Sequence, residues 1–342
     1  MVLVAFEVAV RTLQLATPWT PENRIAIVLF HQDPAGPIEM TPNWEGYVGV
    51  YRLPVRLNGD GFRDRAYSPT PPSGTARIAI IGDSYTMGDG ISRKEAYPKQ
   101  LEERLRQKLP CEVMNCGITA TNSHNQLPLV TRLIESYRPH LIVLGYNVND
   151  FYYRKLTRFE SLKAAGYHYE VHDDQTVMIS KPPSGFVGRV KTEILKRSYG
   201  YRFAQRIRNP VPRPVGIERI EGWIKEDGHL RSFAAVKEMS LKCKAAGVDF
   251  VVMIIPSLLD VLSSITRMDD YPFKEQHATI IKEMESTGIQ VFDVTDDFGD
   301  RNPNDLIAHP LDRHYNPEGC AIVAEAMEKR LLPSLSKYVA HQ

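Results

Sequence analysis

The sequence predicts an α/β protein built on a doubly wound, parallel sheet of five strands. Short apolar runs alternate with amphipathic segments of helical length between residues 76 and 332. Most connections between them are short, as in parallel sheets whose crossovers are helices. The run Ala76–Gly82 is almost continuously apolar and lies between a Pro/Ser/Gly-rich stretch and a tight turn, which is typical of a strand buried on both faces.

The expected elements follow one another in strand–helix order. Leucines at four-residue spacing mark an amphipathic helix over 97–109, which opens near Pro98. Asn316–Glu318 has the form of a cap, a first-turn proline and a first-turn acid, so a last helix begins there. The expected strands are 76–82, 112–115, 141–146, 250–255 and 290–294, and the expected helices are 97–109, 123–137, 230–246, 273–286 and 317–332.

Composition divides the chain into three parts. Residues 1–72 are rich in Pro, Asn and Gly with short apolar alternations, which indicates an N-terminal extension containing a small β region. Residues 73–335 carry the α/β pattern. Within them, 151–230 breaks the rhythm with basic and aromatic residues, so we expect a partly helical insertion that caps the sheet or holds substrate. The alternative interpretation of its basic residues is a solvated face.

Charge and cysteine usage exclude some classes of function. Lys and Arg number 42 against 41 Asp and Glu, and this balance gives no reason to expect nucleic-acid binding. The cysteines show no C-x-x-C pair and no zinc spacing, so we expect free, buried thiols. No metal or cofactor is expected. The four cysteines are Cys111, Cys116, Cys243 and Cys320.

A serine and a histidine stand out as candidate catalytic residues. Ser84 follows the buried run 76–82 on a tight turn into a helix, where it is either a nucleophile or merely a helix cap. A serine hydroxyl needs a base, and His314 lies in a loop after the last strand. Asp312, two residues earlier, points to the same side of an extended loop and can orient the imidazole. His309 with Asp305 forms a rival pair.

Four segments together resemble the GDSL or SGNH hydrolases. They are Gly82-Asp83-Ser84, Asn115-Cys116-Gly117, Asn147-Val148-Asn149-Asp150 and Asp312-Arg313-His314, in the order of that family. The resemblance covers about residues 77–332. It implies a flavodoxin-like three-layer α/β/α sandwich and ester hydrolysis through an acyl-serine, with Ser84, Asp312 and His314 as catalytic residues. It also implies an oxyanion hole made by the N–H groups of Ser84 and Gly117 and the Asn149 side chain.

The chain departs from the family pattern at two places. The family more often has D-x-x-H, whereas here Leu311 stands three residues before the histidine and Asp312 two before it. Asn147 stands where the family usually has the glycine of G-x-N-D, and its side chain could narrow the pocket or add a polar contact. Asp83 and Asp150 are interpreted as stabilising turns, and Asn149 could alternatively only cap its turn.

The resemblance also suggests a substrate class and a location. Relatives act on acetylated sugars, lipids, thioesters and aryl esters, and the basic, aromatic insertion favours a small-acyl, above all acetyl, ester of a carbohydrate. The alternatives are an O-acyltransferase acting on a glycan and a non-catalytic glycan-binding module. Met1–Leu15 is apolar but interrupted by charges, so it is an amphipathic helix or the end of a membrane anchor. Many relatives carry such an anchor, which favours an extracytoplasmic or membrane-associated location over a cytoplasmic one.

Overall fold

The computed structural model contains the parallel sheet that the sequence predicts. It describes residues 2–13, 27–29, 38–47, 54–119, 121–151, 168–171, 176–180, 228–258, 265–309 and 312–339, with single residues between 186 and 222. The sheet has five strands in the order β11-β10-β7-β5-β6, and every neighbouring pair is parallel. These strands are β5 (Ala76–Gly82), β6 (Cys111–Gly117), β7 (Leu141–Tyr146), β10 (Asp249–Ile254) and β11 (Gln290–Asp293).

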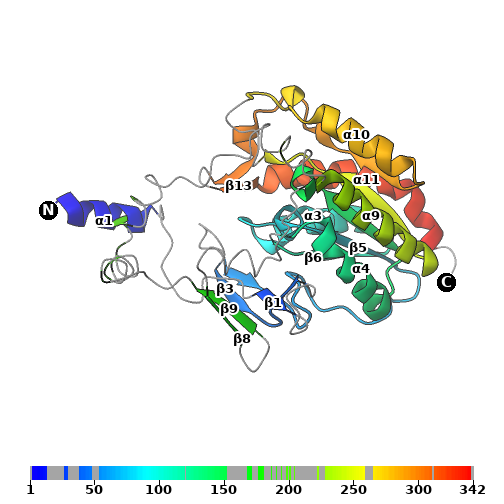
Figure 1. Cartoon of the computed structure of the whole chain (residues 1–342), viewed down its shortest axis with the longest axis horizontal. Coiled ribbons are helices and arrows are strands. Elements are labelled where there is room, and N and C mark those ends of the chain that lie inside the picture. Colours follow the sequence, from blue (N-terminus) through cyan, green and yellow to red (C-terminus); the bar gives the residue numbers. More distant parts are fainter. Residues whose placement is uncertain are drawn as a thin grey trace.

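Helices cover both faces of this sheet, which confirms the three-layer sandwich (Figure 1). On one face α3 (Tyr97–Arg106) packs against α11 (Pro317–Val339). On the other face α4 (Ser123–Tyr137) packs against α9 (Gly228–Ala245), with α10 (Lys274–Glu285) beside α9. The last helix continues past Leu332 and through Pro333, because the buried Leu335 adds apolar contact beyond the proline.

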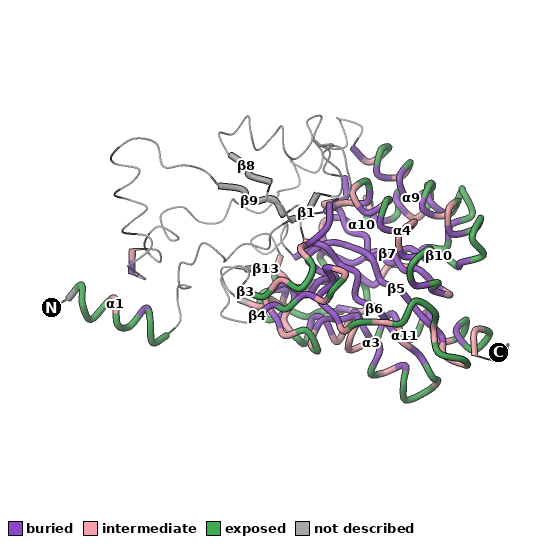
Figure 2. The backbone as a smooth tube through the Cα atoms, turned by 90° about the horizontal axis from the view of Figure 1, so that it is seen from below, coloured by how far each residue is buried: buried purple, intermediate pink, exposed green. Residues whose placement is uncertain are grey.

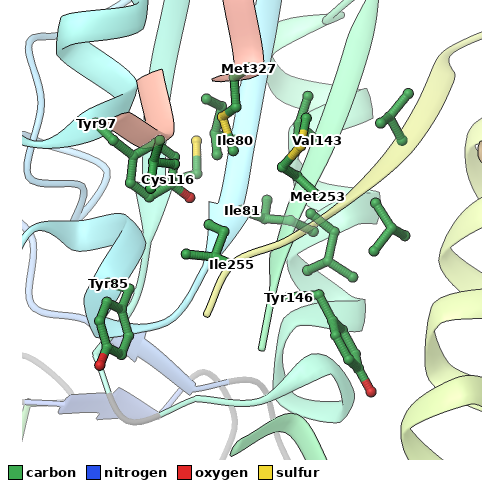
Figure 3. Close-up of a cluster of buried hydrophobic side chains, with 14 of the residues drawn as sticks. Ile80, Ile81, Tyr85, Tyr97, Cys116, Val143, Tyr146, Met253, Ile255 and Met327 are labelled. Atoms are coloured by element: carbon green, nitrogen blue, oxygen red, sulfur yellow. The ribbon is translucent and has the colours of Figure 1, made fainter. Parts of the chain in front are cut away.

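The core lies between the helices and the sheet. Ile80 and Ile81 of β5 are fully buried and lie among side chains of β6, β7 and β10, with Met327 of α11 next to Ile80 (Figure 3). Burying such a side chain stabilises the fold by about 1.5–3 kcal/mol. Figure 2 shows the central strands buried throughout, whereas α1 (Val2–Thr12) is largely exposed. Every residue of β5 is buried, and the candidate nucleophile follows this strand directly.

A second sheet joins two segments that composition separates. Its strands are antiparallel, in the order β2-β1-β9-β8. They are β1 (Ile27–Leu29), β2 (Ile38–Met40), β8 (His168–Val171) and β9 (Thr176–Ser180). The N-terminal extension and the insertion thus share backbone hydrogen bonds, which the sequence did not predict. In Figure 1 this sheet lies outside the α/β sandwich. Most of the insertion lies outside the described residues.

The segment before β5 is attached to the core. The hairpin of β3 (Glu45–Tyr47) and β4 (Pro54–Arg56) leads into a turn in which the Asn58 side chain accepts two backbone N–H groups. The Pro/Ser/Gly-rich stretch before β5 is bound to the core at its start, because the buried Arg77 guanidinium donates to the carbonyl groups of Ser68 and Thr70. The shorter elements are α2 (Ser84–Met87), β12 (Ile307–His309), β13 (Asp312–Tyr315) and the 3-10 turns η1 (Arg93–Glu95), η2 (Val148–Phe151), η4 (Met268–Asp270), η5 (Thr295–Phe298) and η6 (Pro303–Leu306).

The cysteines and the N-terminal helix complete the fold. All four cysteines are buried with free thiols, as expected. Burial raises the pKa of Cys111 to about 11 and that of Cys243 to about 12, so both thiols stay protonated. Glu7 of α1 accepts hydrogen bonds from Ser198 Oγ at 2.8 Å and from the Gly200 N–H at 2.7 Å. Within the described residues, no helix has both the length and the apolar character needed to cross a membrane.

Candidate active site

Ser84 lies at the carboxyl end of the central strand, as the first residue of α2. The preceding Asp83 caps this helix, since its Oδ1 accepts the Tyr85 N–H at 2.9 Å. A Cβ on Gly82 would lie 2.1 Å from Thr86 Oγ1, so the glycine allows α2 to lie directly on the strand end. Ser84 keeps 8 % of its surface exposed, which leaves its hydroxyl accessible at the edge where open α/β sheets bind ligands.

The structure brings His314 to Ser84. Its Nε2 lies 2.7 Å from Ser84 Oγ, a hydrogen-bond distance, across 230 positions of sequence. The sequence placed His314 in a loop, and this was wrong: it lies in β13, paired with β12, because the chain doubles back into a hairpin after η6. Asp312 lies two residues earlier in the same strand, with its backbone opposite His309. The side chains of Asp312 and His309 lie outside the described part, and Asp305 is exposed in η6.

Tyr85 is a site residue that the sequence did not reveal. Its hydroxyl accepts the Leu258 N–H at 2.8 Å and donates to the Arg313 carbonyl at 3.4 Å. Its ring lies 5.1 Å from the imidazole of His314, centroid to centroid. Tyr85 therefore joins the nucleophile helix to β13 and to the loop after β10. Nothing in the order of the chain indicated this, because all three partners are distant in sequence.

The Asn149 amide lies next to the nucleophile turn. Asn149 is in η2, directly after β7, and its Nδ2 donates to Asp83 Oδ2 at 2.7 Å. The same oxygen accepts Asn147 Nδ2 at 3.2 Å. Asp83 thus caps α2 with one carboxylate oxygen and binds two amides with the other. Asp83 therefore stabilises its turn, as expected. It also positions Asn149, the residue predicted to stabilise an oxyanion.

Gly117 is placed by close packing. A Cβ there would lie 2.3 Å from the Met87 backbone nitrogen and 2.7 Å from the Thr86 carbonyl carbon, both parts of α2. Only glycine lets the helix approach the end of β6 so closely. The Gly117 N–H donates to Asn115 Oδ1 at 3.1 Å. Its predicted role as an oxyanion donor requires this N–H to be shared with, or released from, Asn115, and that role stays a prediction.

The order of the strands decides the fold family. Numbered by their order along the chain, the strands lie side by side in the order 2-1-3-4-5. Ser84, Gly117 and Asn149 lie at or just after the carboxyl ends of the first, second and third strands. His314 lies at the same edge of the sheet, next to Ser84. The fold is therefore the flavodoxin-like, doubly wound α/β/α sandwich that the sequence predicts. The switch point of the sheet falls between β5 and β7, where Ser84 and Asn149 lie.

Solved structures of this type match the chain at low identity. TesA is 12 % identical, with a TM-score of 0.41, over 75 % of this chain and 98 % of that one. The esterase EstA from Pseudoalteromonas sp. is 15 % identical, with a TM-score of 0.42, over 75 % and 99 %. The acetylxylan esterase Axe2 from Geobacillus stearothermophilus is 14 % identical, with a TM-score of 0.42, over 80 % and 97 %. No family model and no curated protein matches the sequence. Similarity at this level does not define a substrate.

Asp150 supports the turn after β7 that carries Asn149. Its Oδ1 accepts the Ser123 N–H at the start of α4, and its Oδ2 accepts the Asn147 N–H at 3.0 Å. Burial, reinforced by the nearby Asp83 carboxylate, raises the pKa of Asp150 to about 7 in spite of these hydrogen bonds. Asp150 therefore stabilises the turn after β7, in line with the role interpreted from the sequence. Among the described residues, no group of three or more His, Cys, Asp or Glu could hold a metal ion.

Proposed function

We propose that the protein is a serine ester hydrolase that works through an acyl-serine intermediate. The observation that carries the proposal is the 2.7 Å distance between Ser84 Oγ and His314 Nε2 at the carboxyl edge of the sheet. A serine hydroxyl is a weak nucleophile unless a base takes its proton, and an imidazole within hydrogen-bond reach is the commonest such base.

The first half of the reaction acylates Ser84. Its Oγ attacks the ester carbonyl carbon while its proton passes to His314 Nε2, so the proton of neutral His314 is on Nδ1 beforehand. The carbonyl oxygen becomes an oxyanion, for which the donors are the Ser84 N–H, the Asn149 Nδ2 and, if Asn115 releases it, the Gly117 N–H. The bond to the alkoxy oxygen then breaks, and the alcohol leaves with the proton from His314.

The second half releases the acid. Water attacks the acyl-serine carbon, His314 takes the proton of that water, and Ser84 departs with it as the acid is formed. An alcohol in place of water gives transfer instead of hydrolysis, which is the O-acyltransferase alternative. In either case Asp312 is the residue proposed to orient His314, since it lies in the same strand two positions earlier.

The proposed substrate is a small-acyl ester, above all an acetyl ester of a carbohydrate. Its support is the basic and aromatic composition of residues 151–230, a segment that begins two residues after Asn149. A panel of aryl and sugar esters of increasing acyl length, run with and without sugar acceptors, tests it. Acetyl preference with free acid as product is expected, whereas acylated acceptor as the main product would favour the transferase.

We also propose that the N-terminal helix contacts a membrane surface. Leu3, Val4 and Val8 of α1 are 81 %, 68 % and 55 % exposed. Exposed apolar side chains on one short helix suit the interfacial region of a bilayer. The wild-type protein should sediment with liposomes, and the triple variant with aspartate at these three positions should not. Equal sedimentation of the wild type and the variant would refute the proposed contact of α1 with a membrane.

The catalytic assignment is tested at Ser84 and His314. Ser84→Ala should abolish both hydrolysis of a short aryl ester and labelling by a fluorophosphonate, with an unchanged melting temperature. His314→Ala should lose nearly as much, and the double variant little more, because residues that act as one unit are not additive. Full turnover by folded Ser84→Ala would refute the nucleophile. The alternative of a non-catalytic glycan-binding module predicts no turnover by the parent protein.

A further inference from the structure

Asn147 uses its backbone and its side chain to join the two halves of the site. It is 1 % exposed and lies between β7 and η2. Its Oδ1 accepts the Asn149 N–H at 3.0 Å, and its Nδ2 donates to Asp83 Oδ2 at 3.2 Å. Its own N–H donates to Asp150 Oδ2 at 3.0 Å. One amide side chain thus holds the backbone of Asn149 and the carboxylate that the Asn149 side chain also binds.

The contact with Asp83 determines which end of the Asn149 side-chain amide, nitrogen or oxygen, faces the carboxylate. A carboxylate accepts hydrogen bonds, so the NH₂ group of Asn149, not its carbonyl oxygen, faces Asp83 at 2.7 Å. An amide nitrogen carries two hydrogens, so one of them remains for a second acceptor. Among the described residues, no hydrogen bond is made by the buried Asn149 Oδ1, so the side-chain hydrogen bond seen for this amide is made by its nitrogen.

We infer that Asn147 is a positioning residue for the oxyanion donor Asn149, an inference that rests on the proposed function. By accepting the Asn149 N–H, Asn147 holds the backbone from which the Asn149 side chain extends. By sharing Asp83 Oδ2 it keeps the carboxylate in place to bind the first Asn149 hydrogen, which leaves the second to face the oxyanion formed on Ser84. A glycine at position 147 would supply neither contact.

The consequence is a specific kinetic pattern. An oxyanion exists only after Ser84 is attacked, so a residue that aims its donor affects kcat and leaves KM largely unchanged. Loss of one oxyanion donor lowers kcat on the order of a hundred- to a thousandfold. Loss of the residue that only orients it should cost less, about tenfold to a hundredfold.

The test is a double-mutant cycle with Asn147→Ala, Asn149→Ala and the double variant, measured on a short aryl ester. Asn147→Ala alone should lower kcat about tenfold or more with KM within about twofold. In the Asn149→Ala background the same change should cost less than about twofold, because its only route to the reaction is already lost. The rate of fluorophosphonate labelling is also measured for each variant. The tetrahedral adduct places an oxygen in the proposed oxyanion hole, so the labelling rate should change in parallel with kcat.

Two further variants keep the test decisive. Asn147→Asp keeps the size and the acceptor for the Asn149 N–H but loses the donor to Asp83, so it should also lower kcat even if the alanine variant does not fold. Asn302→Ala is the matched control, since its Oδ1 likewise accepts an N–H two residues on, that of Asn304 at 3.0 Å, and it should keep kcat.

Some outcomes would overturn the inference without touching the proposed function. Wild-type kcat in folded Asn147→Ala, or losses that multiply fully in the double variant, would show that Asn147 does not act through Asn149. A Ser84→Ala protein that still turns over would instead refute the proposed function itself, whatever the cycle shows. Lower melting temperature with normal kcat would make Asn147 a purely structural residue.

Discussion

The Tyr85 hydroxyl links the nucleophile helix to the strand that carries His314. It connects the Leu258 N–H to the Arg313 carbonyl, and its ring packs on the imidazole. Tyr85→Phe keeps the ring and removes both hydrogen bonds, each worth about 0.5–1.5 kcal/mol. We expect kcat to fall about tenfold with little change in KM. Measuring kcat/KM against pH, together with the melting temperature, checks this; a lower melting temperature at normal kcat would contradict a role in positioning His314.

Asp150 should make stability depend on pH. Its pKa is raised to about 7 by burial, so between about pH 4 and pH 7 the folded protein holds a proton that the unfolded chain has released. Stability should therefore fall as pH rises through this window, by an amount on the order of 4 kcal/mol from this group. Urea unfolding of the wild type and of Asp150→Asn at several pH values measures it. Parallel curves for the two proteins would show that Asp150 does not titrate there.

At the scale of elements, the nucleophile helix α2 is held between strand ends that approach it closely. Gly117 is the tightest of these contacts, since a Cβ would meet backbone atoms of Met87 and Thr86 that cannot move without displacing α2. Gly117→Ala should therefore shift Ser84 away from His314, with a loss of at least about a hundredfold in kcat and a cost of about 1–3 kcal/mol in stability. Gly59→Ala is a control for glycine replacement alone, since a Cβ there would meet only Asn43 Oδ1, at 3.8 Å.

That comparison separates two roles of Gly117. If Gly117→Ala melts like the wild type and keeps its kcat, the close packing against α2 does not position the nucleophile. If it is stable but slow, chemical-labelling rates should fall in step with kcat, because both need the same placement of Ser84.

At the scale of the whole molecule, the insertion leaves and re-enters the sandwich at one place. The rings of Phe151, its first residue, of His229, near its end, and of Phe233, just after it, lie 5.9 to 6.1 Å apart. Replacing residues 152–227 with a short Gly/Ser linker should therefore keep the five-stranded sheet, although β1 loses its partner β9. We expect activity on a small acetyl ester to persist within about tenfold while the preference among larger esters changes. Circular dichroism and the ester panel measure the two effects; global unfolding would show that the insertion belongs to the core.

Local sequence pattern determined the elements and the identity of the candidate nucleophile and base. The helix 123–137 and the strand 141–146 were predicted with the bounds that the structure shows, because hydrophobic spacing and turn residues are read within a few neighbours. The glycine, aspartate and serine after β5 identified the turn for the same reason. Ser84 and His314 were therefore accessible to reasoning from the sequence.

Only the tertiary structure decided what these residues touch. The strand pair β1–β9, the hairpin that holds His314, and the contacts of Asn147 and Tyr85 join positions far apart in sequence. Such pairings depend on how whole elements pack, and local pattern carries no information on that packing. The length of α11 was underestimated because a proline locally disfavours a helix that buried contacts of Leu335 extend. The sequence thus determined which residue types are present at the candidate site. The packing of the strand ends around α2 determined how their side chains are oriented.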